Sequence, residues 1–304
     1  MTDDGRAAVA AAPGHVTGFF SVHRDPDPRV AGSRGAGLTL TDEVRVRVEP
    51  VGAGGEGVWL DGRRADVAPV RDVLGAFDGR AAVRIESDLP VGAGFGVSGA
   101  AALGTALAAN AAFDAGRSEN DLVGLAHRAE VEAGTGLGDV VAQARGRAPI
   151  RLEPGAPGHG LLDGIPVCSE RRVEYVSFGE VSTGEVVGGE TDRLTRAGEA
   201  ALDRLRERPT LDRFVDLSRR FAEEAGLLTE RAGDAIADAE AAGGTAAMAM
   251  LGDTAFAVGT ALSDAGYEPS VCSIHPCGAT LVEDGGAGRQ DDEAGVGDDR
   301  SESG

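Results

Sequence analysis

The chain carries the stretch Asp88-Leu-Pro-Val-Gly-Ala-Gly-Phe-Gly-Val-Ser-Gly-Ala-Ala-Ala-Leu103. The strand-like run Ala82–Ser87 precedes it, and a helix of small residues is predicted from Ser98 to Ala112. The three glycines, at positions 92, 94 and 96, permit a sharp bend and a close backbone approach to a ligand. The start of the helix adds unpaired N–H groups and a partial positive charge. Loop and helix together predict an anion site, most often one for phosphate, although a glycine-rich turn without a ligand is the alternative.

Lysine is absent from the chain, and all 29 basic residues are arginine. This absence excludes a Walker A loop and a protein-kinase fold, which both need a lysine, and it excludes Schiff-base chemistry. The spacing G-x-G-x-G also differs from the dinucleotide-binding pattern G-x-G-x-x-G. If the loop holds a nucleotide, its phosphate charge must therefore be met by backbone N–H groups, arginine and a metal ion.

The length and composition fit a globular protein. A chain of 304 residues forms one large or two ordinary domains, and a hydrophobic content of 42% supplies a real core. The sequence contains no apolar run of the roughly 20 residues that cross a membrane, and its start lacks a signal-peptide pattern. Three cysteines do not make a disulfide framework. We therefore expect a cytoplasmic, reduced protein.

The formal net charge is −21. Such a surface repels nucleic acid and anionic lipid, so neither nucleic acid nor a membrane is expected as a partner. An acidic excess without lysine is typical of a cytoplasm kept at high salt, where charge repulsion is screened, and thus of a halophilic source.

The first half of the chain mixes strand and helix signals. A capping box at Ser118–Asp121 predicts a helix through about Ala133. The Gly- and Pro-rich stretch 154–166 is interpreted as a linker between domains. Strands are predicted over residues 38–49, 58–60, 81–85 and 150–152.

The second half continues the mixture, which favours an α+β architecture. From Glu283 onward the chain is acidic with almost no apolar residue, and this predicts a disordered tail over 283–304. Helices are predicted over about 191–208, 210–225, 229–242 and a short segment ending at Gly266, and strands over 173–178, within 246–258, and over 270–274 and 279–282.

Polar residues that can carry chemistry cluster in four segments. These are Ala12-Pro-Gly-His-Val16, the glycine loop with Ser98, the pair His127 and Glu130, and Gly134-Thr-Gly-Leu-Gly-Asp139. The spacing i, i+3 places the pair on one helix face. Each segment also has a structural interpretation: a solvated helix face for the glutamate, core packing for the histidine and a helix cap for the aspartate.

The order and spacing of these segments resemble the GHMP kinases, a family of small-molecule kinases. Their first motif, A-P-G-K/R-V, is similar to Ala12–Val16, and their second, P-x-G-x-G-L-G-S-S-A-A, is similar to Pro90–Ala100. The resemblance covers roughly residues 8–265 and implies ATP and Mg²⁺ as cofactors. It implies that the nucleotide is held by Pro90, Gly92, Gly94, Phe95, Gly96, Val97, Ser98, Gly99 and Ala100.

The family roles carry over by position. The resemblance implies that Ser98 and Glu130 ligate Mg²⁺ and that Asp139 is the catalytic carboxylate, which orients the substrate hydroxyl and accepts its proton. The chain departs from the family pattern at three places. A histidine, His15, stands where mevalonate kinase-like members have lysine, and Val97 and Gly99 replace a serine and an alanine. The third family motif, usually glycine-rich, is matched poorly by residues 248–253.

Within this family, Pro13–Phe20 and residues 31–37, 134–143 and 249–256 are similar to the archaeal members that phosphorylate pantoate to 4-phosphopantoate for coenzyme A synthesis. The pantoate carboxylate calls for an arginine fork or for backbone donors, and Arg151 is favoured over Arg34 as the arginine. Both could instead be ordinary surface arginines. Hydrogen-bond partners for the substrate are expected among His15, Thr17, Ser33 and His127. For Phe19-Phe20, core packing is favoured over a cap on the pocket.

Three other functions stay open at the sequence level. These are a GHMP kinase for another small alcohol such as homoserine or mevalonate, a catalytically silent nucleotide-binding regulator, and a structural or nucleic-acid-binding module, which the acidic charge disfavours. The resemblance implies an N-terminal domain like ribosomal protein S5 over 1–155 and a ferredoxin-like domain over 156–282, with the nucleotide between them. The resemblance is also compatible with a homodimer.

Overall fold

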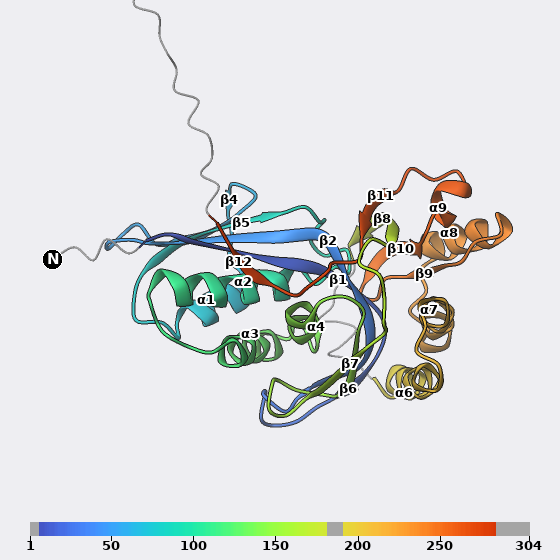
Figure 1. Cartoon of the computed structure of the whole chain (residues 1–304), viewed down its shortest axis with the longest axis horizontal. Coiled ribbons are helices and arrows are strands. Elements are labelled where there is room, and N and C mark those ends of the chain that lie inside the picture. The colour runs from blue at the N-terminus through green and yellow to red at the C-terminus, as the bar shows by residue number, and fades with distance from the viewer. Residues whose placement is uncertain (1–5, 181–190, 284–304) are drawn as a thin grey trace, which may run out of the picture.

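The computed structural model describes residues 6–180 and 191–283. Two β-sheets with helices packed against them form an α+β fold, as the sequence predicts (Figure 1). Residues 284–304, which make up nearly all of the predicted acidic tail, lie outside the described residues.

The larger sheet has eight strands in the described part of the chain, in the order β12-β1-β2-β5-β3-β4, with β6 paired to β2 and β7 paired to β6. Neighbouring strands run antiparallel except β3 and β5, which are parallel. The strands are β1 (Ala8–His23), β2 (Gly32–Pro50), β3 (Gly57–Leu60), β4 (Arg63–Arg64), β5 (Ala81–Ser87), β6 (Pro149–Glu153), β7 (Leu161–Gly164) and β12 (Thr280–Val282).

Strand β1 is the longest element that the sequence analysis leaves unassigned. Residues 10–22 are all buried, so the strand lacks the apolar–polar alternation by which a half-buried strand is recognised. Its partner β2 shows that alternation near its end and is predicted there, but it begins six residues before the predicted start at Leu38. Together they form a long, curved hairpin that reaches both halves of the molecule (Figure 1).

Four helices follow the first strands: α1 (Ala68–Leu74), α2 (Val97–Ala112), α3 (Glu119–Ala133) and α4 (Asp139–Arg145). Helix α2 packs on β1 and β2, and its small residues allow a close approach, since a Cβ on Gly104 would lie 2.7 Å from Val46 Cγ2. The predicted capping box is present, because Ser118 and Asp121 hydrogen-bond to each other's backbone N–H. Gly134 ends α3 with a left-handed backbone, φ +70°.

The smaller sheet has the strand order β11-β8-β10-β9, and all its pairs are antiparallel. Its strands are β8 (Arg172–Glu180), β9 (Ala246–Met248), β10 (Gly252–Val258) and β11 (Ser270–Ser273), and its helices are α6 (Asp192–Glu207), α7 (Leu211–Ala225), α8 (Glu230–Ala241) and α9 (Ala261–Asp264). The predicted helices over 191–208, 210–225 and 229–242 are thus confirmed to within a residue or two.

Strand β1 connects the two halves. Helices α6 and α7 pack against it, and Phe19 and Phe20 meet Phe214 and Phe221 with ring centroids about 6 Å apart. This aromatic cluster confirms core packing for Phe19, which is fully buried. The hairpin that carries the N-terminal sheet is therefore anchored in the C-terminal helices.

The stretch 154–166 is not a plain linker. It contains β7, which pairs with β6, so its first glycines and prolines form the turn of a hairpin. Strand β12, from the end of the described chain, returns to pair with β1 in the larger sheet. The division into domains over 1–155 and 156–282 stays a prediction.

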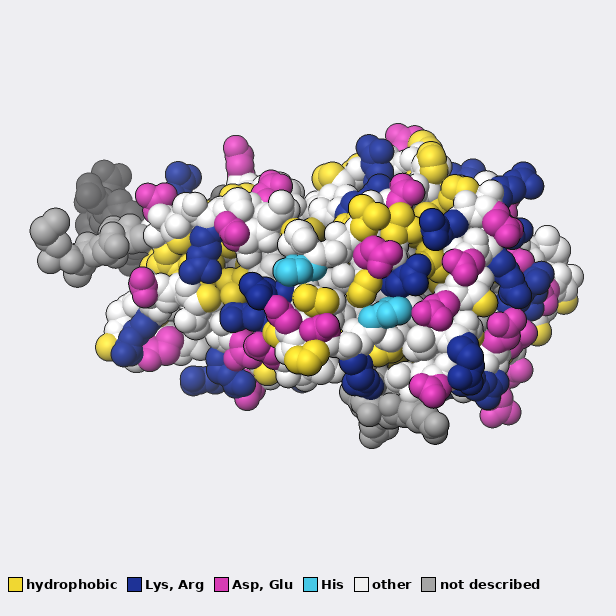
Figure 2. Space-filling model, turned by 90° about the horizontal axis from the view of Figure 1, so that it is seen from below, with side chains coloured by type: hydrophobic (Ala, Val, Ile, Leu, Met, Phe, Trp, Pro, Cys, Tyr) yellow, Lys and Arg dark blue, Asp and Glu magenta, His cyan; other side chains and the backbone are white. Residues whose placement is uncertain are grey.

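Surface arginines stand among acidic side chains. On the face shown in Figure 2, the two kinds are interspersed. Some of these arginines form ion pairs with neighbouring carboxylates, such as Arg84–Glu49 (3.0 Å) and Arg219–Glu223 (3.2 Å). Such exposed pairs contribute little stability each, typically below about 1 kcal/mol.

Among the described residues, no helix combines the length and the apolar character that crossing a bilayer requires.

Candidate active site

The site is built on an irregular part of β1. Its pairing with β2 shifts register between Pro13 and Gly14 and again between Thr17 and Phe19. Register shifts of this kind re-aim side chains, and the segment between them carries His15 and Thr17. The backbone N–H of His15 donates a 2.9 Å hydrogen bond to the Phe95 carbonyl, which ties this segment to the glycine loop.

The His15 imidazole contacts the Asp139 carboxylate, with 2.7 Å between Nδ1 and Oδ1. Asp139 is the first residue of α4, whose cap is Gly138, so its carboxylate is not the helix cap that the sequence allowed. His15 is fully buried, whereas the Asp139 side chain keeps 20% of its exposure. Thr17 Oγ1 also points toward Oδ1, at 3.5 Å.

The surroundings of His15 and Asp139 determine the protonation state of each side chain. Burial lowers the pKa of His15 below its usual 6.5, despite the neighbouring carboxylate. Burial alone would raise the pKa of Asp139, but the hydrogen bond from His15 and the nearby Arg151 hold that pKa below its usual value. An ionised carboxylate only accepts hydrogen bonds, so Nδ1 of a neutral His15 carries the proton.

Arg151 lies beside this pair and is almost fully buried, with 1% exposure. This rules out the surface-arginine interpretation. Its Nε donates to Ser33 Oγ at 3.2 Å, while its Nη1 is buried without a hydrogen-bond partner among the described residues. Gly138 makes room for both, since a Cβ there would lie 2.4 Å from Ser33 Oγ. A buried arginine with an unused donor is suited to hold an anionic group.

A small pocket, which we call the acceptor pocket, opens beside Arg151. Its volume is about 20 Å³, little more than one water molecule occupies. Its lining comprises Thr17, Phe20, Ser33, Gly136, Leu137, Gly138, Asp139, Arg151 and Leu251.

The glycine loop borders a larger cleft of about 380 Å³, which we call the loop cleft. Gly92, Gly94 and Gly96 have φ values of +77°, +88° and +64°, a backbone that residues with a side chain adopt only at a cost. Helix α2 begins directly after Gly96, so its free N–H groups face this end of the loop. The loop cleft is lined by Thr17, Val91, Gly92, Gly94, Phe95, Gly96, Val97, Ser98, Ala133, Gly134, Thr135, Asp139, Met250 and Leu251.

Glu130 lies at the same end of the loop. It is 2% exposed, which rules out a solvated helix face, and it accepts a 2.6 Å hydrogen bond from the Ser98 hydroxyl. Burial raises its pKa to about 7, although that hydrogen bond acts in the opposite direction. Gly136 leaves the space beside it, because a Cβ there would lie 2.4 Å from Glu130 Oε2.

The acceptor pocket and the loop cleft share three lining residues, Thr17, Asp139 and Leu251. One carboxylate thus borders both the glycine loop and a separate pocket that contains an arginine. This arrangement suits a transfer reaction between a phosphorylated donor and a small acceptor.

Several predicted site residues do not line either cavity. His127 Nε2 lies 2.9 Å from the Ala31 carbonyl in the interior, and Arg34 donates to the Leu152 carbonyl at 2.7 Å. His15 contacts Asp139 and Thr17 but lines neither cavity. The loop cleft is not lined by three of the predicted loop residues, Pro90, Gly99 and Ala100. The roles assigned to the predicted site residues stay predictions.

Other lining residues were given no role from the sequence. Gly136 and Gly138 lie in a quoted motif, so their glycine spacing was a usable signal. Phe20 lines the acceptor pocket and also packs against Phe221, whereas the sequence analysis favours core packing alone. Leu251 lies in the poorly matched third motif and in the stretch 249–256 that resembles the pantoate-phosphorylating members, but its residue type does not mark it as a pocket residue.

No group of three or more His, Cys, Asp or Glu side chains within residues 6–180 and 191–283 is placed to hold a metal ion. Glu130 and Ser98 nevertheless offer hard oxygen atoms next to the glycine loop. Mg²⁺ is commonly bound by one or two carboxylates, substrate phosphates and water, so this donor set fits Mg²⁺ brought with a nucleotide.

Known proteins resemble this chain in sequence and in fold. Residues 67–147 match the family described as GHMP kinases N terminal domain. A pantoate kinase of Methanocaldococcus jannaschii is 32% identical, over 87% of this chain and 99% of its own length. A pantoate kinase of Thermococcus kodakarensis is 36% identical, over 72% of this chain and 76% of its own length.

A solved structure described as a phosphotransferase related to the CoA biosynthesis pathway is also similar. It shares 30% sequence identity and a TM-score of 0.81, covering 91% of this chain and 99% of its own. GHMP kinases use ATP. The fold, the glycine loop and the similar proteins all indicate this family. The chain therefore belongs to the GHMP kinases and, among them, to the pantoate kinases.

Proposed function

We propose that this protein transfers the γ-phosphoryl group of ATP to the 4-hydroxyl of pantoate, giving 4-phosphopantoate and ADP for coenzyme A biosynthesis. The observation that carries the proposal is the position of Asp139, which faces both the loop cleft and the acceptor pocket. The similarity to pantoate kinases over most of the chain supports the choice of acceptor.

Pantoate has a carboxylate at one end and the reacting hydroxyl at the other. The unused Nη1 of Arg151 is the donor for the carboxylate, and Ser33 holds the same guanidinium in place through its Nε. Because Arg151 and Asp139 line one pocket, a substrate held by its carboxylate presents a hydroxyl to Asp139. Thr17, on the same wall, is the partner for a further hydroxyl.

Asp139 orients the 4-hydroxyl and accepts its proton as the oxygen attacks the γ-phosphorus. Its lowered pKa keeps it ionised at neutral pH, the form that accepts a proton. Neutral His15 donates a hydrogen bond to Oδ1 and fixes the orientation of the carboxylate. Since phosphoryl transfer has a loose transition state, this positioning contributes more than the basicity of Asp139.

The phosphates of ATP lie against the backbone N–H groups of the glycine loop and the start of α2. Glu130 and Ser98 would hold Mg²⁺, which neutralises phosphate charge when bound. Metal binding would require ionised Glu130, and Ser98, whose hydroxyl donates to Glu130 Oε1, would supply a further oxygen ligand.

We further propose a cytoplasmic location and a homodimer.

The test is ADP release at high KCl with ATP, Mg²⁺ and a panel of pantoate, homoserine, mevalonate and galactose. Turnover with pantoate alone is the expected outcome. Turnover with another alcohol would retain a kinase but replace the acceptor. Folded protein that turns over none of the four would contradict the proposed function.

A further inference from the structure

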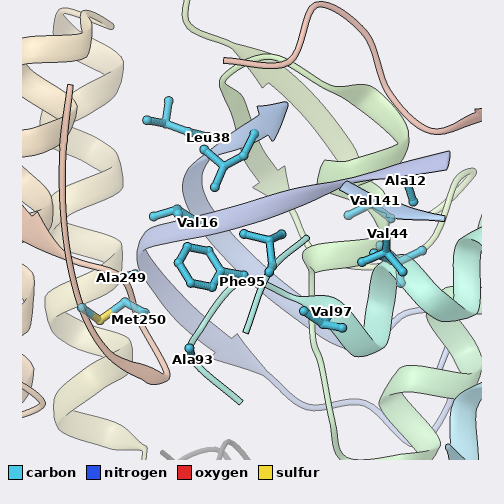
Figure 3. Close-up of a cluster of buried hydrophobic side chains, with 14 of the residues drawn as sticks. Ala12, Val16, Leu38, Val44, Ala93, Phe95, Val97, Val141, Ala249 and Met250 are labelled. Atoms are coloured by element: carbon cyan, nitrogen blue, oxygen red, sulfur yellow. The ribbon is translucent and has the colours of Figure 1, made fainter. Parts of the chain in front are cut away.

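The turn between β9 and β10 brings the C-terminal half to the site. The Met250 N–H donates to the Thr17 carbonyl, and the Ala249 N–H donates to the Thr254 carbonyl, both at 2.9 Å. Figure 3 shows Ala249 and Met250 beside the segment that carries Ala93. Gly252 fits there only without a side chain, because a Cβ would lie 1.9 Å from the Ala93 carbonyl oxygen. The turn is therefore fixed against both β1 and the glycine loop.

Leu251, at the tip of this turn, has a left-handed backbone with φ +67°. Among the described residues only Asp61, Asp114 and Arg147 share a positive φ without being glycine. Aspartate tolerates that region better than a branched aliphatic residue does. Backbone strain of this kind persists where the surroundings impose it and occurs often at functional sites.

Leu251 borders both cavities. With Phe20 and Leu137 it supplies the large apolar lining of the acceptor pocket, whose other side chains are polar. Of these three, Leu251 alone comes from the C-terminal half. It therefore completes a pocket that β1 and the turn before α4 leave open.

Pantoate carries two methyl groups on the carbon between its two hydroxyl-bearing carbons. Arg151, Asp139 and Thr17 account for its polar groups, but the methyl groups require apolar contact to compensate for their removal from water. We infer that Leu251 covers these methyl groups and is a specificity-determining residue. The inference rests on the proposed function. Because the acceptor pocket has only about 20 Å³, a substrate must displace part of its wall, and shortening residue 251 directly enlarges that space.

The experiment compares pantoate with 2,4-dihydroxybutanoate, which keeps the carboxylate and both hydroxyls but lacks the methyl groups. The readout is the ratio of their kcat/KM values at saturating ATP and Mg²⁺. One methyl group in an apolar pocket changes kcat/KM by roughly 10- to 200-fold, so the wild-type ratio is expected to favour pantoate strongly. Leu251→Ala should lower this ratio about 10-fold, mainly by reducing kcat/KM for pantoate.

Leu161→Ala is the matched control, because Leu161 is exposed on β7 and lines neither cavity. It should leave the ratio unchanged. Leu251→Gly suits the left-handed backbone and provides a second shortened variant if the alanine variant is unstable. An unchanged ratio in a folded Leu251 variant would overturn the inference. Wild-type protein that does not turn over pantoate would instead contradict the proposed function.

Discussion

Two carboxylates, one buried and one partly exposed, lie on either side of the Gly134–Gly138 turn, and their surroundings act on them in opposite directions. Glu130, at the end of α3, has the Ser98 hydroxyl beside it, and burial raises its pKa to about 7. Asp139, at the start of α4, is also largely enclosed. It receives a hydrogen bond from His15, lies near Arg151 and keeps a pKa below its usual value.

These opposite surroundings allow one cleft to give its two carboxylates different roles. A carboxylate that stays ionised is ready to accept a proton, whereas one held near neutrality gains charge when a cation approaches. We therefore propose that the Asp139 region carries out proton transfer and that the Glu130 region binds the cation. The glycine loop connects the regions, because Gly96 lies against Asp139 and Ser98 follows two residues later.

The largest effect is expected from Asp139→Asn. An amide keeps the size of the side chain but does not accept the substrate proton, so kcat should fall by about 10³-fold. The affinity for ATP, measured by nucleotide titration, should change little. Asp163→Asn, at an exposed position, is the control. Turnover within twofold of wild type would remove Asp139 from the chemistry.

The next largest effect concerns stability. The pKa of Glu130 is about 7 in the folded protein against an ordinary 4.5, so the folded state binds more protons between these values. The stability from protonated Glu130 is complete below about pH 4.5 and is lost as the pH rises through about 7. The loss amounts to about 3 kcal/mol at pH 8.

Glu130→Gln is uncharged at every pH and avoids this loss. In the absence of nucleotide and Mg²⁺, the variant should therefore be more stable than wild type at pH 8 by up to about 3 kcal/mol and by much less at pH 5. Denaturant unfolding at high KCl measures both values. The exposed Glu132→Gln, on the same helix, should show no such pH dependence. An equal difference at pH 5 and pH 8 would contradict the assigned pKa.

A smaller effect is expected at His15. Removing its hydrogen bond in His15→Ala should lower kcat about 10- to 100-fold, because Asp139 loses its orienting donor. His15→Asn places an amide N–H near the position of Nδ1 and should recover most of the loss. Since burial keeps His15 neutral above its lowered pKa, the loss should be the same at pH 7 and pH 8.5. A loss that disappears at pH 8.5 would point to a charged imidazole.

The smallest effect tests the link between the two regions. In Gly96→Ala the new Cβ would lie 3.1 Å from both Asp139 Cβ and Gln143 Nε2, on a backbone with φ +64°. The resulting shift of Asp139 should lower kcat about 10-fold. Gly54→Ala has a similar φ of +87° but nothing within 4 Å, so it should cost only about 1 kcal/mol of stability and leave kcat unchanged. If kcat were the same in Gly96→Ala and Gly54→Ala, the contact between residue 96 and Asp139 would have no effect on turnover beyond that of the backbone strain.

The sequence by itself determined the local elements. The glycine spacing before α2, the capping box at Ser118 and the periodic helices of the second half depend on residues within a few positions of one another. The same local signals indicated the phosphate-binding loop and placed Ser98, Glu130 and Asp139 in the family motifs.

Only the tertiary structure decided what surrounds these residues. Strand β1 has no readable period because its two faces are buried by elements far away in the chain. The burial of Arg151, the contact between His15 and Asp139 and the place of Leu251 each depend on segments more than 100 residues apart. Local sequence does not encode such distances, since they arise when the halves pack through β1 and exclude water from the polar groups between them.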